Sequence, residues 1–278
     1  MNNYYYGKTD KAESWFETAH HFAQHNSAHS KKTSSLPLVQ FWKPKPNRDF
    51  ELRIRAFASA CNQKYEEFSK GKFCFEYPVA PNQPIAKFGK GSASMTDLMI
   101  FGAESVFALE AKWTECETSY EPIGKWRKKN PRNRTQVLDG WLTYIREYIE
   151  SHAGNSTAIP SSESIIQDHP EVPYQLIHRI ASACKVAEEN SCTPVTVYHL
   201  FYEANKREKT NAFATSRLYT SFQNVFADIA HLLPFFVVST EVSTNKRITD
   251  KIKRTNDLFD EMQHNTVYNF GMTGLVPK

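Results

Sequence analysis

Two short apolar stretches decide the expected fold of this chain: Met95-Thr-Asp-Leu-Met-Ile-Phe101 and Val106-Phe-Ala-Leu-Glu-Ala-Lys-Trp113. Both are rich in residues that favour strands. The four residues between them, Gly102-Ala-Glu-Ser105, suit a tight antiparallel turn. The sequence therefore predicts a β-hairpin whose second strand is apolar on both faces, which is typical of a strand covered on both sides.

The register of this hairpin brings polar residues together. If Phe101 pairs with Val106, Asp97 lies opposite Glu110, and because side chains alternate faces along a strand, Lys112 shares their face. Two carboxylates across a strand pair repel each other, so they are either solvated or neutralised by a cation. Hard oxygen ligands suit Mg²⁺, and a neighbouring lysine can hold a water nucleophile or stabilise phosphate charge. The alternative is a solvated hairpin face with an incidental ion pair.

Helices and strands are expected to alternate on both sides of the hairpin. Apolar periodicity predicts helices at 10–24, 48–68, 135–149, 174–189, 216–230 and 249–262. Further strands are predicted at 72–79, 193–202, 235–242 and 266–270, with a linker at 25–35 and a loop or insertion at 151–170. This order indicates an α/β fold, a central mixed β-sheet flanked by helices. We expect residues 1–45 to form an N-terminal helical extension and linker, and residues 46–278 to form one domain.

Composition narrows the class of protein. The 278 residues are 40% hydrophobic and 23% charged, with a net charge of +4, so a substantial core and a nucleic-acid partner are both compatible with the chain. Five cysteines without a C-x-x-C pair argue against a disulfide framework or zinc ribbon. The chain starts without a signal-peptide pattern, and its longest apolar run is too short to span a bilayer. We therefore expect a cytoplasmic protein without membrane contact. Phosphate-loop and nucleophile-elbow motifs are absent from the sequence.

One spacing resembles a known family. Thr96-Asp97, twelve intervening residues and then Glu110-Ala-Lys112 resemble the signature of the PD-(D/E)XK nuclease superfamily, which has the restriction-endonuclease-like fold. The predicted element order over residues 48–203 is similar to that family's core. The resemblance implies Asp97, Glu110 and the carbonyl of Ala111 as ligands of Mg²⁺ or Mn²⁺, with Lys112 as the catalytic lysine.

The resemblance has departures and open positions. Thr96 stands where the family often has proline. The family often adds a glutamate from the first helix, for which Glu51 is a candidate and Glu66 and Glu67 remain alternatives. Gln136 opens the helix after the hairpin, where some relatives place a catalytic glutamine near the lysine. An ordinary polar residue in a first helical turn is the alternative reading.

A basic stretch follows the hairpin. We expect a loop here that contacts a nucleic-acid backbone, although a solvated charged loop is the alternative. Its basic residues are Lys125, Arg127, Lys128, Lys129, Arg132 and Arg134, with Trp126 among them. Further along, Gln175, His178 and Arg179 share a helix face that either points to the cleft or packs as an ordinary helix.

Together these features predict a Mg-dependent phosphodiester hydrolase that acts on DNA, with RNA left open. The resemblance adds a role in prokaryotic restriction or defence, and a homodimer for cutting two strands. The alternatives are a catalytically inactive nucleic-acid-binding module of the same fold and a structural or interaction protein.

Overall fold

The computed structural model describes residues 3–8, 12–24, 34–44, 48–82, 93–113, 120–153, 159–252 and 255–277. A seven-stranded mixed sheet runs through it in the order β1 to β7. The strands are β1 (Asn3–Tyr6), β2 (Lys72–Val79), β3 (Ser94–Phe101), β4 (Ser105–Lys112), β5 (Thr193–Tyr202), β6 (Phe235–Thr244) and β7 (Tyr268–Leu275). Neighbours β2–β3, β3–β4 and β6–β7 are antiparallel, whereas β1–β2, β4–β5 and β5–β6 are parallel.

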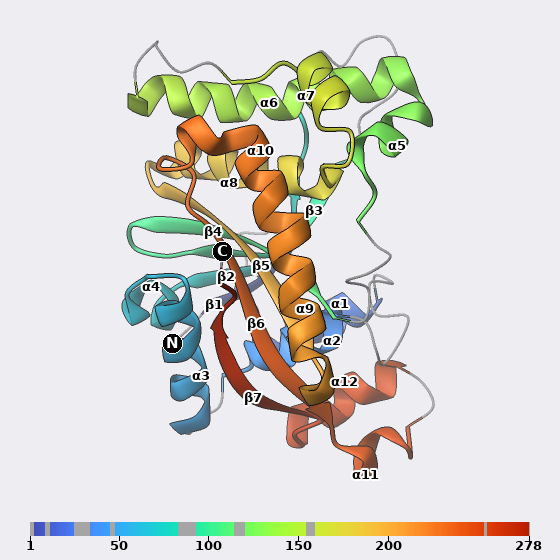
Figure 1. Ribbon diagram of the computed structural model, residues 1–278. Helices are drawn as coiled ribbons and strands as arrows, with labels where there is room; N and C mark the ends of the chain where they lie inside the picture. The colour runs from blue at the N-terminus through green and yellow to red at the C-terminus, as the bar shows by residue number, and fades with distance from the viewer. Residues whose placement is uncertain are drawn as a thin grey trace.

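Helices cover both faces of the sheet, as predicted (Figure 1). One layer contains α6 (Pro131–Ala153), α8 (Tyr174–Asn190) and α10 (Thr220–Phe226), and the other contains α1 (Trp15–Gln24), α2 (Ser35–Phe41), α3 (Arg48–Ala60) and α12 (Thr255–His264). The remaining helical segments are α4 (Tyr65–Ser69), α5 (Ile123–Lys128), α7 (Ser162–Asp168), η2 (Ala204–Lys206), α9 (Arg207–Phe213), η3 (Ala214–Tyr219), η4 (Ala227–Ile229) and α11 (Lys246–Thr249).

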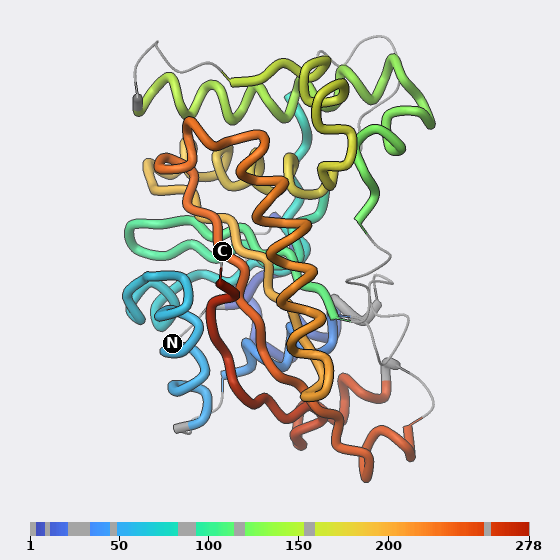
Figure 2. Tube along the Cα trace, viewed as in Figure 1, coloured from blue at the N-terminus to red at the C-terminus, as the bar shows by residue number. Residues whose placement is uncertain are grey.

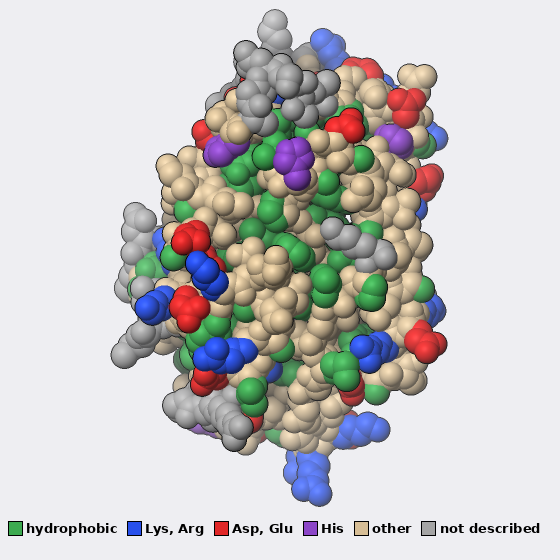
Figure 3. Space-filling model, turned by 60° about the vertical axis from the view of Figure 1, so that its left-hand side comes forward, with side chains coloured by type: hydrophobic (Ala, Val, Ile, Leu, Met, Phe, Trp, Pro, Cys, Tyr) green, Lys and Arg blue, Asp and Glu red, His purple; other side chains and the backbone are tan. Residues whose placement is uncertain are grey.

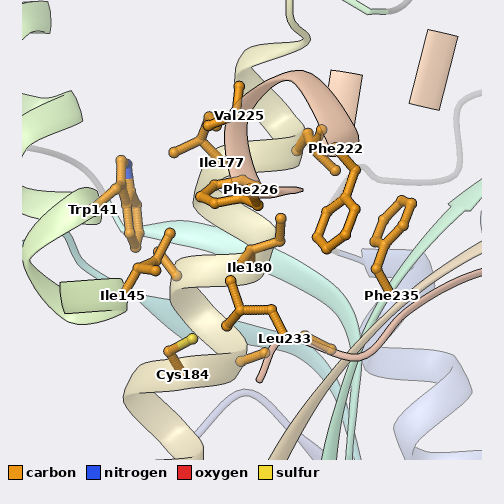
Figure 4. Packing of buried hydrophobic residues seen from close by; sticks show 14 of the residues in the cluster. Trp141, Ile145, Ile177, Ile180, Cys184, Phe222, Val225, Phe226, Leu233 and Phe235 are labelled. Carbon is orange, nitrogen blue, oxygen red and sulfur yellow. The ribbon is translucent and has the colours of Figure 1, made fainter. Parts of the chain in front are cut away.

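Each layer buries its own apolar core against the sheet. In the first layer, Trp141 of α6, Ile180 of α8 and Phe226 of α10 converge over the sheet, where Phe235 of β6 meets them (Figure 4). Among the described residues, no helix is long and apolar enough to cross a membrane. On the face shown in Figure 3, Lys and Arg side chains lie scattered among Asp and Glu side chains, in keeping with the modest net charge of +4.

The predicted bounds of strands β2 and β5 are confirmed. The single helix predicted at 48–68 is wrong, because the chain turns between α3 and α4 and Asn62 adopts a φ of 51°. The stretch at 151–170, predicted as a loop, contains α7, whose N-cap Ser161 accepts the backbone N–H of Ser164. The basic stretch is also not a loop, because it forms α5 and the first turn of α6.

The predicted boundary at residue 45 is a further correction. β1 pairs with β2 inside the common sheet, and α1 contacts both β1 and α12. Helices α1 and α12, near the two ends of the chain, thus pack in the same layer (Figure 2). α2 begins at Ser35, the last residue of the predicted linker, and is buried almost completely, while residues 25–33 of that linker lie outside the described residues. Residues before 45 therefore contribute to the same core rather than to a separate extension.

Candidate active site

The β3–β4 hairpin has the predicted register, since Phe101 pairs with Val106. The turn is braced by Glu67 of α4, whose Oε2 accepts the backbone N–H groups of Glu104 at 3.1 Å and Ser105 at 3.2 Å. Glu67, an alternative metal ligand in the sequence, is buried at this turn and supports the hairpin instead.

The backbone ladder of the hairpin ends one pair before the polar residues. Its last pair is Leu98 with Leu109. Beyond this point Asp97 Oδ2 accepts the backbone N–H of Ala111 at 2.7 Å. A side-chain carboxylate thus replaces the next ladder bond, so the two strands part where Asp97 and Glu110 face each other.

Glu110 and Lys112 lie on this same face and form a buried ion pair, with Lys112 Nζ 2.7 Å from Glu110 Oε1. A second cation reaches Glu110 from α8, where Arg179 Nη2 contacts Glu110 Oε2. Burial alone would raise the pKa of Glu110, but Arg179 and Lys112 together lower it to about 2. Glu110 is therefore a stable carboxylate held from both sides.

Asp97 has the opposite electrostatic balance. Burial and the negative charge of Glu110 raise its pKa to about 7, although Lys112, Arg179 and the N–H of Ala111 oppose this shift. Its carboxyl group thus lacks full charge compensation from the protein. A carboxyl of this kind gains the most from an added cation.

Glu76 of β2 is a third carboxyl group that the sequence reasoning missed. It interrupts the β2–β3 ladder opposite Asp97, between the pairs Phe75–Leu98 and Tyr77–Thr96. Burial and then Asp97 raise its pKa to about 8. Its φ of 50° is strained for a residue with a side chain, at a cost of roughly 1–3 kcal/mol. A carboxyl group in the middle of a strand, within the mostly apolar stretch 73–79, was the available sequence signal, whereas the backbone strain was visible only in the structure.

Neutral groups complete the surroundings of Glu110. Tyr198 of β5 lies in register with it and is fully buried, and its hydroxyl has no hydrogen-bond partner among the described residues. Burial and Glu110 raise the pKa of Tyr198 well above its usual value, so it stays a phenol. His178 Nδ1 lies 3.0 Å from Ser94 Oγ, and burial together with Arg179 lowers the pKa of His178 well below its usual value. Both rings are therefore uncharged at neutral pH.

Two predicted site residues lie elsewhere. Glu51 is exposed on α3, pairs with Arg55 at 2.7 Å, and belongs to the helix layer on the opposite face of the sheet. Its assignment as a metal ligand is wrong for this reason, and Glu66 is also exposed. Gln136 is exposed on α6, and the described contacts do not join it to Lys112. The role of the Ala111 carbonyl stays a prediction.

A stack of aromatic rings connects the basic stretch to the candidate site. Trp126 stacks on Tyr174 with ring centroids 3.7 Å apart, and Tyr174 lies 4.9 Å from the ring of His178. The guanidinium of Arg134 also lies 4.9 Å from the ring centroid of Trp126. α5 is thereby fixed against the helix that supplies Arg179.

The cations of this stretch differ in their surroundings. Lys125, Lys128 and Arg132 are exposed. Lys129 pairs with Glu121 at 2.5 Å, and Arg127 donates to Thr135 Oγ1 at 3.1 Å. Lys125 and Lys128 are thus the clearest candidates for contact with an anionic polymer.

The donor set fits a loosely held divalent cation better than a preformed cage. Among the described residues, no three His, Cys, Asp or Glu groups are arranged to hold a metal ion. Mg²⁺ usually needs only one or two carboxylates, because waters and substrate oxygens supply the rest. Asp97 and Glu110 meet this requirement. Because the pKa values of Asp97 and Glu76 are raised, an added cation would displace protons from these two carboxyl groups.

The comparisons with known proteins give a family without an assigned activity. A family model described as a domain of unknown function, DUF6946, matches residues 8–259, so the chain belongs to that family. No curated protein and no solved structure matches the chain. The match also spans both sides of residue 45, in agreement with the shared core.

Proposed function

We propose that this member of the DUF6946 family is a Mg²⁺- or Mn²⁺-dependent phosphodiester hydrolase that acts on DNA. The observation that carries the proposal is the convergence of Asp97, Glu110 and Lys112 on one face of a hairpin, where the backbone ladder has ended. Their types and order resemble those of PD-(D/E)XK nucleases. The uncompensated charge of Asp97 gives these residues a reason to bind a cation.

The element order supports the same proposal. Helices α3 and α4, the antiparallel strands β2 to β4, helices α6 and α8 and the parallel strand β5 follow one another as in a restriction-endonuclease-like core. Assignment to that fold is part of the proposal, as are a cytoplasmic location, a homodimer and a role in prokaryotic defence.

The roles of the side chains follow from their positions. Asp97 and Glu110, with the carbonyl of Ala111, would hold the cation, which when bound stabilises negative charge on the phosphate. Lys112 would orient the attacking water, because its ammonium group already lies at the carboxylate that borders the site. The phenol of Tyr198, which has no hydrogen-bond partner among the described residues, is a neutral donor for a water or a phosphate oxygen. Lys125 and Lys128 would contact the substrate backbone.

The test is cleavage of plasmid, linear duplex, single-stranded DNA and RNA with Mg²⁺ or Mn²⁺. We expect metal-dependent cleavage that Asp97→Asn and Lys112→Ala each reduce by at least about a hundredfold. The matched control is Lys64→Ala, which removes an exposed lysine paired with Glu104 at 3.8 Å, away from the hairpin face. Cleavage that survives Lys112→Ala would refute the proposed site. Cleavage of RNA alone would reassign the substrate.

A second candidate function is a nucleic-acid-binding module without activity. The observation that favours it is the neutralisation of Glu110 by two protein cations, because such a carboxylate is satisfied without a metal. Under this alternative, the protein binds DNA with an affinity that falls with added salt and cleaves no substrate under any metal condition.

A further inference from the structure

Arg179 forms an ion pair with Glu110, the carboxylate that a metal ion would need as a ligand. Its side chain is 3% exposed and that of Glu110 is 2% exposed, so the pair is shielded from water. The other oxygen of Glu110 is taken by Lys112 at 2.7 Å. Both oxygens of the carboxylate are therefore in contact with protein cations.

Arg179 is anchored independently of Glu110. Its Nη1 donates to Thr96 Oγ1 at 2.8 Å, and its Nη2 donates to the backbone carbonyl of Met95 at 2.8 Å. Both acceptors lie on β3. The guanidinium can thus keep its place when Glu110 turns away from it.

The surroundings of Glu110 have spare donors for an additional oxygen. The Tyr198 hydroxyl and the Arg179 Nε are buried and have no hydrogen-bond partner among the described residues. Buried donors are usually satisfied by protein or water. Two of them beside one carboxylate indicate a site that accepts a further polar ligand, such as the water shell of a cation or a phosphate oxygen.

We propose that Arg179 is a resident counter-ion, which neutralises Glu110 in the metal-free protein and which a divalent cation displaces from this carboxylate. The inference rests on the proposed metal-dependent function and concerns the regulation of that site. In this scheme Arg179 affects the metal through its contact with Glu110. Because the metal must compete with a buried guanidinium for Glu110, Arg179 weakens metal binding and raises the metal concentration at which the site fills.

The direction of this effect separates it from a structural role. If Arg179 competes with the cation, its removal tightens metal binding. If Arg179 only supports the fold, its removal weakens metal binding or leaves it unchanged.

The experiment is calorimetric titration of the full chain with MnCl₂. Arg179→Met keeps an unbranched side chain without charge, and Arg179→Lys keeps the charge. Arg55→Met is the matched control, because Arg55 forms an exposed pair on the opposite helix layer. We expect Mn²⁺ to bind Arg179→Met about tenfold more tightly than wild type, a change of about 1.4 kcal/mol. We expect Arg179→Lys to stay within about threefold of wild type, and Arg55→Met to match wild type.

The possible outcomes separate the counter-ion role of Arg179 from the metal site itself. Unchanged or weaker Mn²⁺ binding by Arg179→Met, with binding by wild type and none by Asp97→Asn, would overturn the counter-ion inference and leave the metal site standing. Equal behaviour of wild type and Asp97→Asn would overturn the proposed metal site itself.

A second measurement uses wild type, in case Arg179→Met fails to fold with Glu110 left unpaired. In protein labelled with ¹⁵N-arginine, the guanidinium signals of Arg179 are those missing from Arg179→Lys. We expect these signals to shift as Mg²⁺ is added, because Nη2 loses its carboxylate partner. Signals that stay in place while Mg²⁺ binds would refute the displacement.

Discussion

Acid is expected to destabilise this protein through His199 of β5. The ring of His199 is fully buried among Phe41, Phe57 and Phe201, on the sheet face away from the candidate site. Its Nε2 bonds to Thr240 Oγ1 at 2.8 Å, whereas its Nδ1 has no partner among the described residues. Burial lowers the pKa of His199 from 6.5 to about 3, so the native ring is neutral.

The size of the effect follows from proton linkage. Below pH 6.5 the unfolded chain binds a proton at His199 that the folded protein excludes until about pH 3. Stability therefore falls with decreasing pH across this window, by about 1.4 kcal/mol per pH unit once the unfolded histidine is fully protonated. Between pH 7.5 and pH 5.0 the loss attributable to His199 is about 2 kcal/mol.

The assay is urea denaturation at pH 7.5 and pH 5.0 for wild type, His199→Leu and the exposed control His231→Leu. Leucine leaves Thr240 with its second partner, Thr273 Oγ1 at 3.0 Å. We expect His199→Leu to lose about 2 kcal/mol less than wild type between the two pH values, and His231→Leu to follow wild type. An equal loss in wild type and His199→Leu would refute the reasoning.

Three further predictions concern the hairpin brace, helix packing and substrate contact. Glu67→Ala leaves a buried N–H group (Ser105) and a part-buried one (Glu104) of the hairpin turn without their acceptor. We therefore expect the free energy of unfolding, measured by urea denaturation, to fall by about 1–3 kcal/mol, and a loss below about 0.5 kcal/mol would contradict the brace. Gly140→Ala places a Cβ 2.4 Å from the backbone oxygen of Asn82, in the segment after β2. We expect the free energy of unfolding of this variant to fall by about 1–3 kcal/mol. In the control Gly274→Ala the new Cβ meets nothing within 4 Å, so its free energy of unfolding should stay within about 0.5 kcal/mol of wild type. Equal melting temperatures for the two glycine variants would contradict the packing argument. Replacing Lys125 and Lys128 with glutamine should lower the slope of log affinity for duplex DNA against log salt by about 2, measured by fluorescence anisotropy; an unchanged slope would exclude both residues from phosphate contact.

Sequence patterns predicted the structure correctly where it depends on residues close together in the chain. β2 and β5 have their predicted bounds because the side chains of β2 alternate in character and β5 is a run of β-branched and aromatic residues. The hairpin register was also predictable, since a short turn leaves few ways to pair Phe101. β1 was missed because its four residues pair with β2, which lies far along the chain.

The residues of the candidate site likewise fall into those that the sequence predicted and those that it did not. Asp97, Glu110 and Lys112 are found from sequence because alternation along two adjacent strands places them together. Arg179 was visible only as one polar residue on a helix face, and Glu76 had no assigned role. Glu51 was misplaced because helical periodicity does not reveal which face of the sheet a helix covers.

By itself, the sequence determined the hairpin, its register and the three polar residues on one face, because these depend on backbone geometry between near neighbours. Only the tertiary structure decided the charge balance of that face. It carried Arg179 from α8 to Glu110 and set Glu76 of β2 beside Asp97, and it buried Glu110 and Arg179 while leaving Asp97 and Glu76 partly exposed. Electrostatic energies depend on distance and burial, which are properties of the assembled fold rather than of any one segment.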